Sequence, residues 1–353
     1  MRPGNQRGNQ WTAMSFGIKF TSVYTSGPAM RQNQKPVGIF LNKCLTAILL
    51  TIAASTSSAQ EIRAVPVNIF GDGDPFNGVE DSRQPVTVAP GDRRSTARHQ
   101  MNAGTISCDG KFRGTAMVID AREFAYDIGG VVLATAAHVL YNLDKKKLFG
   151  RCYFHFMGWE KDAGYRARIN LKRVRMGDFD PNKATGTTEF GEGDWAFLYL
   201  SKPWKRFNPD QSIRVREFSF SRSGSYRRSG GEFRLLAFDS SAGVISESRN
   251  CMVVESGGDD LGGGAWKGQL LDDCDSADGA SGGGIIAVVN QAYYLIGIRN
   301  GSHWSELVYP PDRFPSGPPD GSAWDRRLNT NFGRAIDTHL LHEINDLIQS
   351  HIE

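Results

Sequence analysis

Three short segments of this 353-residue chain place a histidine, an aspartate and a serine beside apolar runs. His138 ends the run GVVLATAAH, Asp194 opens the run DWAFLYL, and Ser281 lies among small residues in DGASGGG. A serine nucleophile needs a base that takes its proton, an acid that orients the base, and N–H donors for the oxyanion. We therefore predict that His138 is the general base and acid, Asp194 its orienting carboxylate and Ser281 the nucleophile. The backbone N–H groups of Gly279 and Ser281 are the expected oxyanion donors.

Each of these residues also has an ordinary structural interpretation. A histidine after an apolar strand is usually structural, an aspartate at a strand start often caps it, and a glycine-rich turn is often only flexible. The order of the three residues, and the apolar run IIAVV soon after Ser281, favour catalysis. GASGG also fits the G-x-S-x-G turn of the α/β-hydrolases, but that turn needs a strand before the serine and a helix after it. Here a polar segment precedes Ser281 and a strand is expected after it.

The elements that must position these residues are predicted to be strands. Short β-type runs separated by turn signals extend from GTISC at residue 104 to AYYLIGI at residue 292. Many short strands without helical patterns between them predict an all-β barrel or sandwich architecture. At the end of the chain, apolar residues at helical spacing predict an amphipathic α-helix that packs on the β-structure. These residues are Ile336, Leu340, Ile344, Leu347 and Ile348.

The first 59 residues have a composition of their own. They contain six Lys or Arg and no Asp or Glu, which leaves 35 basic and 38 acidic residues in the rest. The charge therefore gives no reason to expect nucleic acid as a partner. Residues 30–59 run from a basic stretch through an apolar run to small residues, as in a secretory signal peptide cleaved after Ala59. A membrane anchor or a disordered tail is the alternative.

This interpretation divides the N-terminal part of the chain into three segments. Residues 1–29 are expected to be an upstream segment, residues 30–59 the signal peptide, and residues 60–103 an extended lead-in or a propeptide. The protein is then expected to be secreted or periplasmic, with no stable membrane anchor once the signal is removed.

Cysteine usage agrees with export. Cys44 falls in the signal segment, which leaves Cys108, Cys152, Cys251 and Cys274. An even number of cysteines in an exported protein predicts disulfide bonds. Of the three pairings, proximity in sequence favours Cys108 with Cys152 and Cys251 with Cys274; four free buried thiols are the alternative.

The same segments resemble those of a known family. TAAH with His138, DWAFL with Asp194 and DSADGASGG with Ser281 look like the three signature segments of the chymotrypsin/trypsin superfamily, and the resemblance spans about residues 80–350. VEDSRQPV, the CDSxxGxSG form and the helical C-terminus are closer to its bacterial glutamyl-endopeptidase-like branch. The resemblance implies a protease domain at 104–353 made of two six-stranded antiparallel barrels. The first, about 104–205, would carry His138 and Asp194, and the second, about 206–353, would carry Ser281.

The chain departs from this family in three respects. Digestive-type members have an aspartate directly before the serine, where this chain has Ala280, and they begin with an Ile-Val-Gly-Gly type terminus that is not found here. Activation by a new N-terminal amine is therefore not expected. Val139 replaces the cysteine that usually follows the histidine.

Substrate preference is ambiguous. Asp275, followed by Ser276, stands where trypsins bind Lys or Arg side chains, although the same pair occurs in the glutamyl branch. Arg299 stands where that branch has a histidine that contacts acidic side chains. The sequence leaves the choice between basic and acidic residues open.

Together these features predict an exported serine endopeptidase that cleaves protein or peptide substrates through an acyl-enzyme. No metal ion or cofactor is implied. The alternatives are a catalytically silent binding protein on the same fold and an esterase that uses the same triad.

Overall fold

The computed structural model describes residues 67–71, 81–86, 102–125, 129–156, 166–179, 192–201, 212–218, 232–255, 268–304, 307–308, 310, 312–314 and 318–352. These ranges fall within one compact unit, Ile62–Glu353. The expected signal segment, residues 30–59, lies outside the described residues. Within the described ranges, no helix is both long and apolar enough to cross a membrane.

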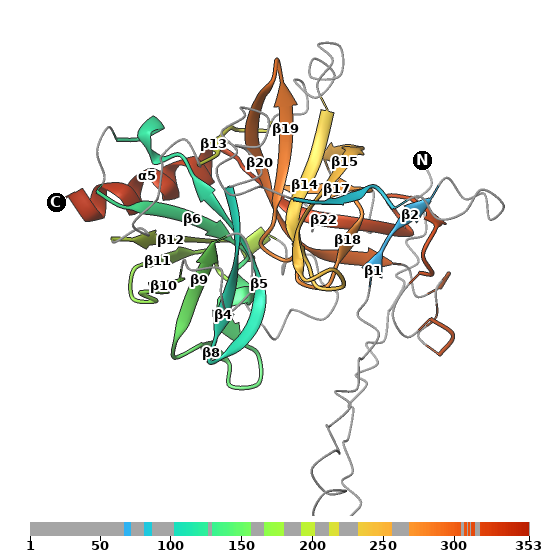
Figure 1. Cartoon of the computed structure of the whole chain (residues 1–353), viewed down its shortest axis with the longest axis horizontal. Helices are drawn as coiled ribbons and strands as arrows, with labels where there is room; N and C mark the ends of the chain where they lie inside the picture. Colours follow the sequence, from blue (N-terminus) through green and yellow to red (C-terminus); the bar gives the residue numbers. More distant parts are fainter. Residues whose placement is uncertain are drawn as a thin grey trace, which may run out of the picture. The chain divides into compact units, whose positions relative to one another are not determined.

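A seven-stranded antiparallel sheet, teal to green in Figure 1, forms the first half of this unit. Its spatial order is β10, β9, β4, β5, β6, β12 and β11. The strands are β4 (Ala103–Cys108), β5 (Lys111–Ile119), β6 (Val131–Thr135), β9 (Cys152–Phe156), β10 (Arg166–Ile169), β11 (Val174–Met176) and β12 (Ala196–Leu200). A 3-10 turn η2 (Ala121–Glu123) follows β5, and a short hairpin joins β7 (Tyr141–Asn142) to β8 (Lys147–Leu148). β6 and β12 are buried at every position, which agrees with their continuous apolar sequences.

A second sheet of nine strands, yellow to red in Figure 1 apart from β3, forms the other half. The order is β16, β17, β22, β20, β19, β14, β15 and β3, and β13 joins it by parallel pairing with β20. The strands are β3 (Arg83–Pro85), β13 (Arg214–Val215), β14 (Glu232–Asp239), β15 (Val244–Cys251), β16 (Val253–Glu255), β17 (Gln269–Asp272), β19 (Gly284–Val289), β20 (Ala292–Trp304) and β22 (Asn329–Ala335). One apolar cluster contains buried residues of both sheets, and Leu236, Ile286 and Leu295 are among those that come from the second sheet.

The C-terminal helix α5 (Thr338–Ile352) packs against the first sheet although it follows the second in sequence. Its buried stripe consists of Leu340, Ile344, Leu347 and Ile348, as the sequence spacing predicts. A carboxylate oxygen of Asp337 accepts the backbone N–H of Leu340 and so caps the first turn. The helix contacts β12 and β11, which explains why β12 is buried on both faces.

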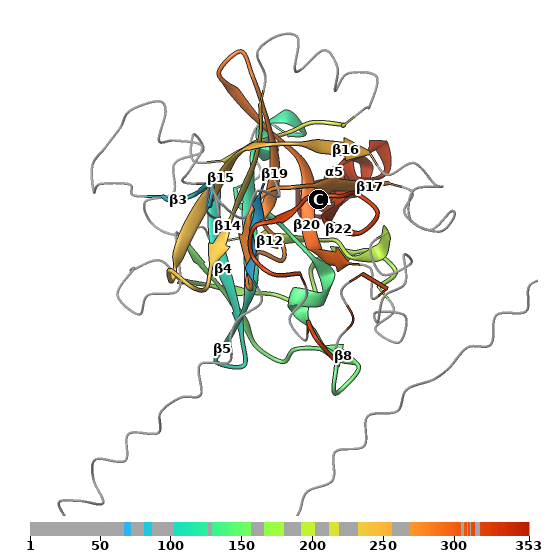
Figure 2. The same ribbon diagram turned by 90° about the vertical axis from the view of Figure 1, so that its right-hand side faces the viewer.

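Part of the lead-in expected at residues 60–103 joins the second half of the unit. β1 (Val67–Asn68) pairs with β18 (Ser276–Ala277), and β2 (Phe70–Gly71) pairs with β21 (Ser322–Ala323). β3 lies along β15, as Figure 2 also shows. The described lead-in residues therefore add strands to the fold.

The all-β class and the C-terminal helix are confirmed, with two curled antiparallel sheets. The two sheets have seven and nine strands where six each were expected, and in the second sheet β3 from the lead-in and the short strand β13 add to the count. The structure also contains two disulfides, Cys108–Cys152 and Cys251–Cys274, the pairing that sequence proximity favours. The first joins cysteines that lie opposite each other on β4 and β9.

Candidate active site

His138 and Asp194 come from the ends of two adjacent antiparallel strands. In the register of β6 and β12, Thr135 faces Ala196. His138 lies three residues after Thr135, in the 3-10 turn η3 (Ala137–Leu140), and Asp194 lies two residues before Ala196. The ladder between β6 and β12 therefore brings the two side chains together from 56 residues apart.

The carboxylate of Asp194 binds both the backbone and the ring of His138. Oδ1 accepts the backbone N–H of His138 at 2.8 Å, and Oδ2 lies 2.7 Å from Nδ1. Asp194 is fully buried, whereas the His138 side chain keeps 20% of its surface exposed. Because a carboxylate only accepts hydrogen bonds, Nδ1 carries the proton, and Nε2 of the neutral ring is left as the basic nitrogen.

The environment raises the pKa of His138 above its ordinary value. Burial alone would lower this pKa, but the negative charge of Asp194 and its hydrogen bond favour the protonated ring and outweigh burial. The pair can therefore stabilise a proton on the imidazole, which a general base must hold during a reaction.

The turn that carries Ser281 is fixed against the first sheet by Thr115 of β5. The backbone N–H of Thr115 donates to the carbonyl of Ser281 at 2.7 Å, and its hydroxyl donates to the carbonyl of Gly279 at 2.8 Å. Gly282 has φ of +81°, and a Cβ added there would collide with the carbonyl of Thr115 and the hydroxyl of Thr135, so no side chain fits. Thr135 precedes His138 by three residues, so the serine turn lies beside the strand end that leads to the histidine.

Two backbone N–H groups of this turn have no hydrogen-bond partner among the described residues: those of Gly279 and Ser281. Gly279 has φ of +96°, and a Cβ there would lie 2.8 Å from the ring of Phe112. This position therefore needs glycine. Unpartnered N–H groups two residues apart on a glycine-rich turn can bind a negatively charged oxygen.

A pocket of about 140 Å³ lies beside the serine turn. It is lined by residues 276–281 on one side and by Arg299, Gly301, Ser302 and Trp304 of β20 on the other. In this structure the Ser281 hydroxyl donates to the carbonyl of Asn300 at 3.3 Å. The pocket thus lies next to Ser281 and the two unpartnered N–H groups, just before β19.

No protein-family model matches the chain, and no curated protein matches it. The chain is similar to a solved Glu endopeptidase. That structure, a Glu endopeptidase in complex with MPD, is 13% identical, with a TM-score of 0.48 over 76% of this chain and 98% of that one. At this level the likeness bears on neither the activity nor the site residues, which rest on the geometry of this chain.

Arg299 lines the pocket and is almost fully buried, with 2% of its side chain exposed. Its Nη2 donates to Asp272 at 2.7 Å, while its Nε and Nη1 are buried without a hydrogen-bond partner among the described residues. Burial raises the pKa of Asp272, although the charge of Arg299 and the N–H of Cys274 lower it. Buried N–H groups without partners are unfavourable, so this guanidinium is suited to an acceptor from a ligand.

The other two specificity candidates lie in the chain segment directly before the serine turn. Ser276 lines the pocket, but Asp275 is not among the lining residues. The carboxylate of Asp275 instead accepts the backbone N–H groups of Phe70 and Ser82. Burial raises its pKa, and these donors lower it.

Sequence reasoning did not find Thr115 or Asp272. Thr115 lies within an ordinary strand sequence, and nothing local marks it as the residue that fixes the serine turn. Asp272 did have a signal, because an acid that ends the apolar segment QLLD needs a buried partner.

Proposed function

We propose that this chain is an exported serine endopeptidase that cleaves protein or peptide substrates. The observation that carries the proposal is the Asp194–His138 pair, formed at adjacent strand ends beside a serine turn with two unpartnered N–H groups. The two disulfides support a location in an oxidising compartment outside the cytoplasm, where such bonds persist.

The proposed reaction proceeds through an acyl-enzyme. The Ser281 hydroxyl turns from Asn300 toward His138, whose Nε2 takes the proton as the serine oxygen attacks the carbonyl carbon of the substrate. The N–H groups of Gly279 and Ser281 bind the resulting oxyanion, and Asp194 stabilises the imidazolium. His138 then gives the proton to the leaving amine. In the second step a water molecule, whose proton passes to His138, attacks the acyl carbon; the Ser281 oxygen leaves, takes the proton back from His138, and the carboxylic acid is released.

For substrate preference we propose Arg299 rather than Asp275 as the selecting residue. The unpartnered Nε and Nη1 of Arg299 favour a carboxylate or amide oxygen on the side chain before the cleaved bond. Asp275 already accepts two backbone N–H groups, so it is not available to a basic side chain.

Cleavage-site profiling on a peptide library tests this preference. We expect cuts after acidic residues in the wild type, and loss of that preference in Arg299→Gln combined with Asp272→Asn, which keeps a neutral hydrogen-bonded pair in the buried site. Cuts after Lys or Arg would instead assign specificity to Asp275.

A fluorophosphonate probe, which reacts with activated serines, tests the activity itself. We expect the probe to label the mature protein and expect no labelling of Ser281→Ala. Ser302→Ala serves as the control, because Ser302 lines the same pocket but hydrogen-bonds to Asn331. A folded wild type that stays unlabelled would favour the silent binding protein. Hydrolysis of esters but not of peptides would favour the esterase.

A further inference from the structure

Two described segments of the lead-in, residues 67–71 and 81–86, bind the second half of the unit; we call them the N-terminal arm. Val67 pairs with Ala277 and Asn68 with Ser276 in an antiparallel ladder. Arg83, Gln84 and Pro85 pair with β15. The arm thus pairs both with the segment just before Ser281 and with β15.

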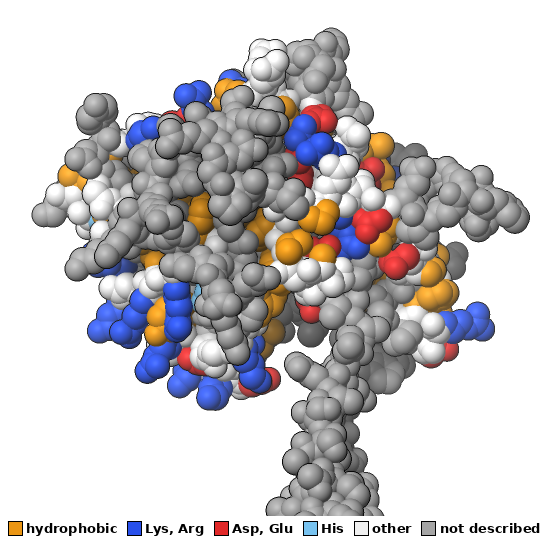
Figure 3. Space-filling model, viewed as in Figure 1, with side chains coloured by type: hydrophobic (Ala, Val, Ile, Leu, Met, Phe, Trp, Pro, Cys, Tyr) orange, Lys and Arg blue, Asp and Glu red, His pale blue; other side chains and the backbone are white. Residues whose placement is uncertain are grey.

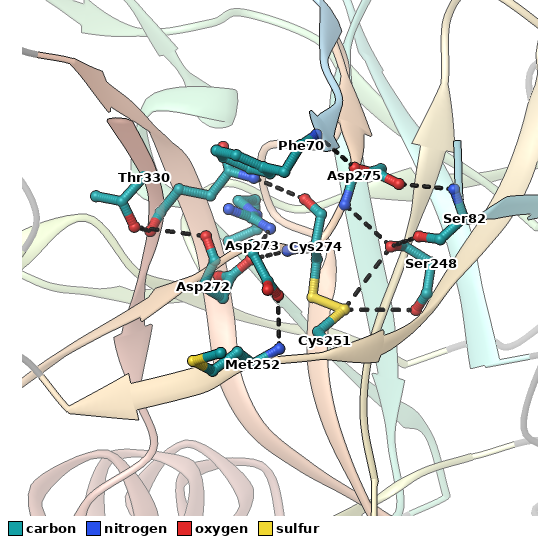
Figure 4. The surroundings of a disulfide bond; sticks show 12 residues. Phe70, Ser82, Ser248, Cys251, Met252, Asp272, Asp273, Cys274, Asp275 and Thr330 are labelled. Atoms are coloured by element: carbon teal, nitrogen blue, oxygen red, sulfur yellow. Dashed lines mark hydrogen bonds and ion pairs between the residues drawn. A yellow bond between two sulfur atoms is a disulfide. The ribbon is translucent and has the colours of Figure 1, made fainter. Parts of the chain in front are cut away.

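Asp275 is the point where the two segments of the arm meet. Its Oδ1 accepts the backbone N–H of Phe70 at 2.8 Å, and its Oδ2 accepts that of Ser82 at 2.7 Å (Figure 4). The backbone N–H of Asp275 donates to the hydroxyl of Ser248 at 3.0 Å, and this hydroxyl lies 2.7 Å from that of Ser82. A buried carboxylate is stable only when its oxygens are bonded, so Asp275 depends on the arm for its two donors.

The residues next to Asp275 form part of the pocket. Ser276 and Ala277 pair with the arm as strand β18, and both line the pocket. The carbonyl of Ala277 accepts the N–H of Ala280, directly before Ser281. A displacement of β18 would therefore move the pocket wall at Ser276 and Ala277, whereas the serine turn is also held by Thr115 of β5.

The described residues of the arm are not among those that line the pocket. A propeptide that inhibits by filling the site would have to lie across Ser281, whereas the described arm residues pair with β18 and β15 and donate to Asp275.

We propose that the N-terminal arm stays on the mature protein and, through Asp275, holds the pocket wall at Ser276 and Ala277 in the conformation that receives the substrate side chain. This inference rests on the proposed function for the identity of the pocket. Asp275 is then a positioning residue, and the mature chain must begin before Val67.

Hydrogen exchange on the secreted full-length mature protein tests the link without using activity. We expect slow exchange at Phe70, Ser82 and β18 in the wild type, and fast exchange at all three in Asp275→Ala. Asp275→Asn, which keeps one acceptor oxygen, serves if the alanine variant fails to fold. The matched control is Asp273→Asn, because Asp273 also accepts a backbone N–H, that of Met252, but forms no hydrogen bond with the described residues of the arm.

Kinetics on the same variants test the effect on the pocket. For a peptide whose side chain enters the pocket, we expect kcat/KM of the Asp275 variants to fall about 100-fold, because a small displacement of a positioning group has effects of that size. Labelling by a fluorophosphonate without such a side chain should change by less than about threefold, because it does not use the pocket wall. A purely structural role would reduce both rates together.

The outcomes separate this inference from the proposed function. Unchanged exchange at β18 in the Asp275 variants overturns the arm's role, as does an active mature protein that begins after residue 86. Equal loss of peptide cleavage and of labelling overturns it as well. A wild type that is never labelled, yet shows the expected exchange pattern, contradicts the protease proposal and supports the arm.

Discussion

At the scale of single residues, the Asp194–His138 pair has the most direct consequences. One carboxylate bonds both the backbone N–H and the ring of the same histidine, so it fixes the ring's position and its tautomer together. Asp194 is fully buried, so its charge acts on the imidazole with little screening by water.

The raised pKa of His138 predicts the acid limb of the pH profile. Below this pKa the ring is protonated and cannot act as a base, so kcat/KM should rise with pH through an apparent pKa above about 6.5. Asp194→Asn should shift that limb to lower pH, because the charge that raises the pKa is removed, and should lower kcat about 10⁴-fold. Asp144→Asn, at an exposed position, is the control. An unchanged limb in Asp194→Asn would contradict this assignment.

At the scale of elements, the serine turn depends on β5 of the other sheet. The Thr115 hydroxyl donates to Gly279 and accepts the backbone N–H of Phe238, so this one group connects β5, β14 and the turn. Residues more than 120 positions apart in sequence are joined here by a single hydroxyl.

Thr115→Val tests this connection with nearly unchanged shape. We expect unfolding free energy to fall by about 1–3 kcal/mol, because the Phe238 N–H is left buried without its acceptor, and we expect slower probe labelling. Thr105→Val is a matched control, since the Thr105 side chain is equally buried and its hydroxyl has no hydrogen-bond partner among the described residues. Urea unfolding of both variants provides the measurement. Equal effects of the two substitutions would show that the hydroxyl of Thr115 does not hold the turn.

The sequence predicts local features better than contacts between distant segments. Apolar runs and helical spacing predict the strands and α5, because each depends on neighbours a few residues away. The Asp194–His138 contact was predictable from residue order, through the resemblance to a family. The contacts of Asp275 with Phe70 and Ser82, about 200 residues earlier, have no local signal, so the sequence left its role open.

Ala280, directly before Ser281, lies in an apolar environment. The sequence gives no expectation of activation by an N-terminal amine, because no acid precedes the serine. In the structure Ala280 is buried in the apolar cluster of the second sheet, with Phe233, Leu270 and Ile285. An acid there would lack water and a charged partner within that cluster.

At the scale of the whole molecule, the disulfides and the charge distribution stand out. Each disulfide lies within one half of the unit and closes a modest loop, with sequence separations of 44 and 23 residues. Figure 3 shows Lys and Arg side chains gathered at the lower left, over the first sheet. Lys145, Lys146 and Lys147 are exposed in the β7–β8 hairpin of that half, so charge is uneven although the net charge is small.

Removal of each disulfide should lower stability by a similar amount. For loops of these lengths the chain-entropy model gives about 3–4 kcal/mol each. Cys251→Ser with Cys274→Ser should also weaken peptide cleavage, because Cys274 directly precedes Asp275, whereas Cys108→Ser with Cys152→Ser should affect mainly stability. Urea unfolding and peptide kinetics of both double variants give the comparison. Unchanged unfolding free energies would contradict the loop-closure argument.

The bond from Phe70 to Asp275 also has a consequence for biosynthesis. It joins residues 205 positions apart, so most of the chain must be made before the pocket wall can form. A contact of such long range forms late, because the intervening chain must first be ordered. Under the proposed function, the newly made protein would therefore carry Ser281 before its substrate pocket is ordered, and cleavage of other proteins would begin only after folding.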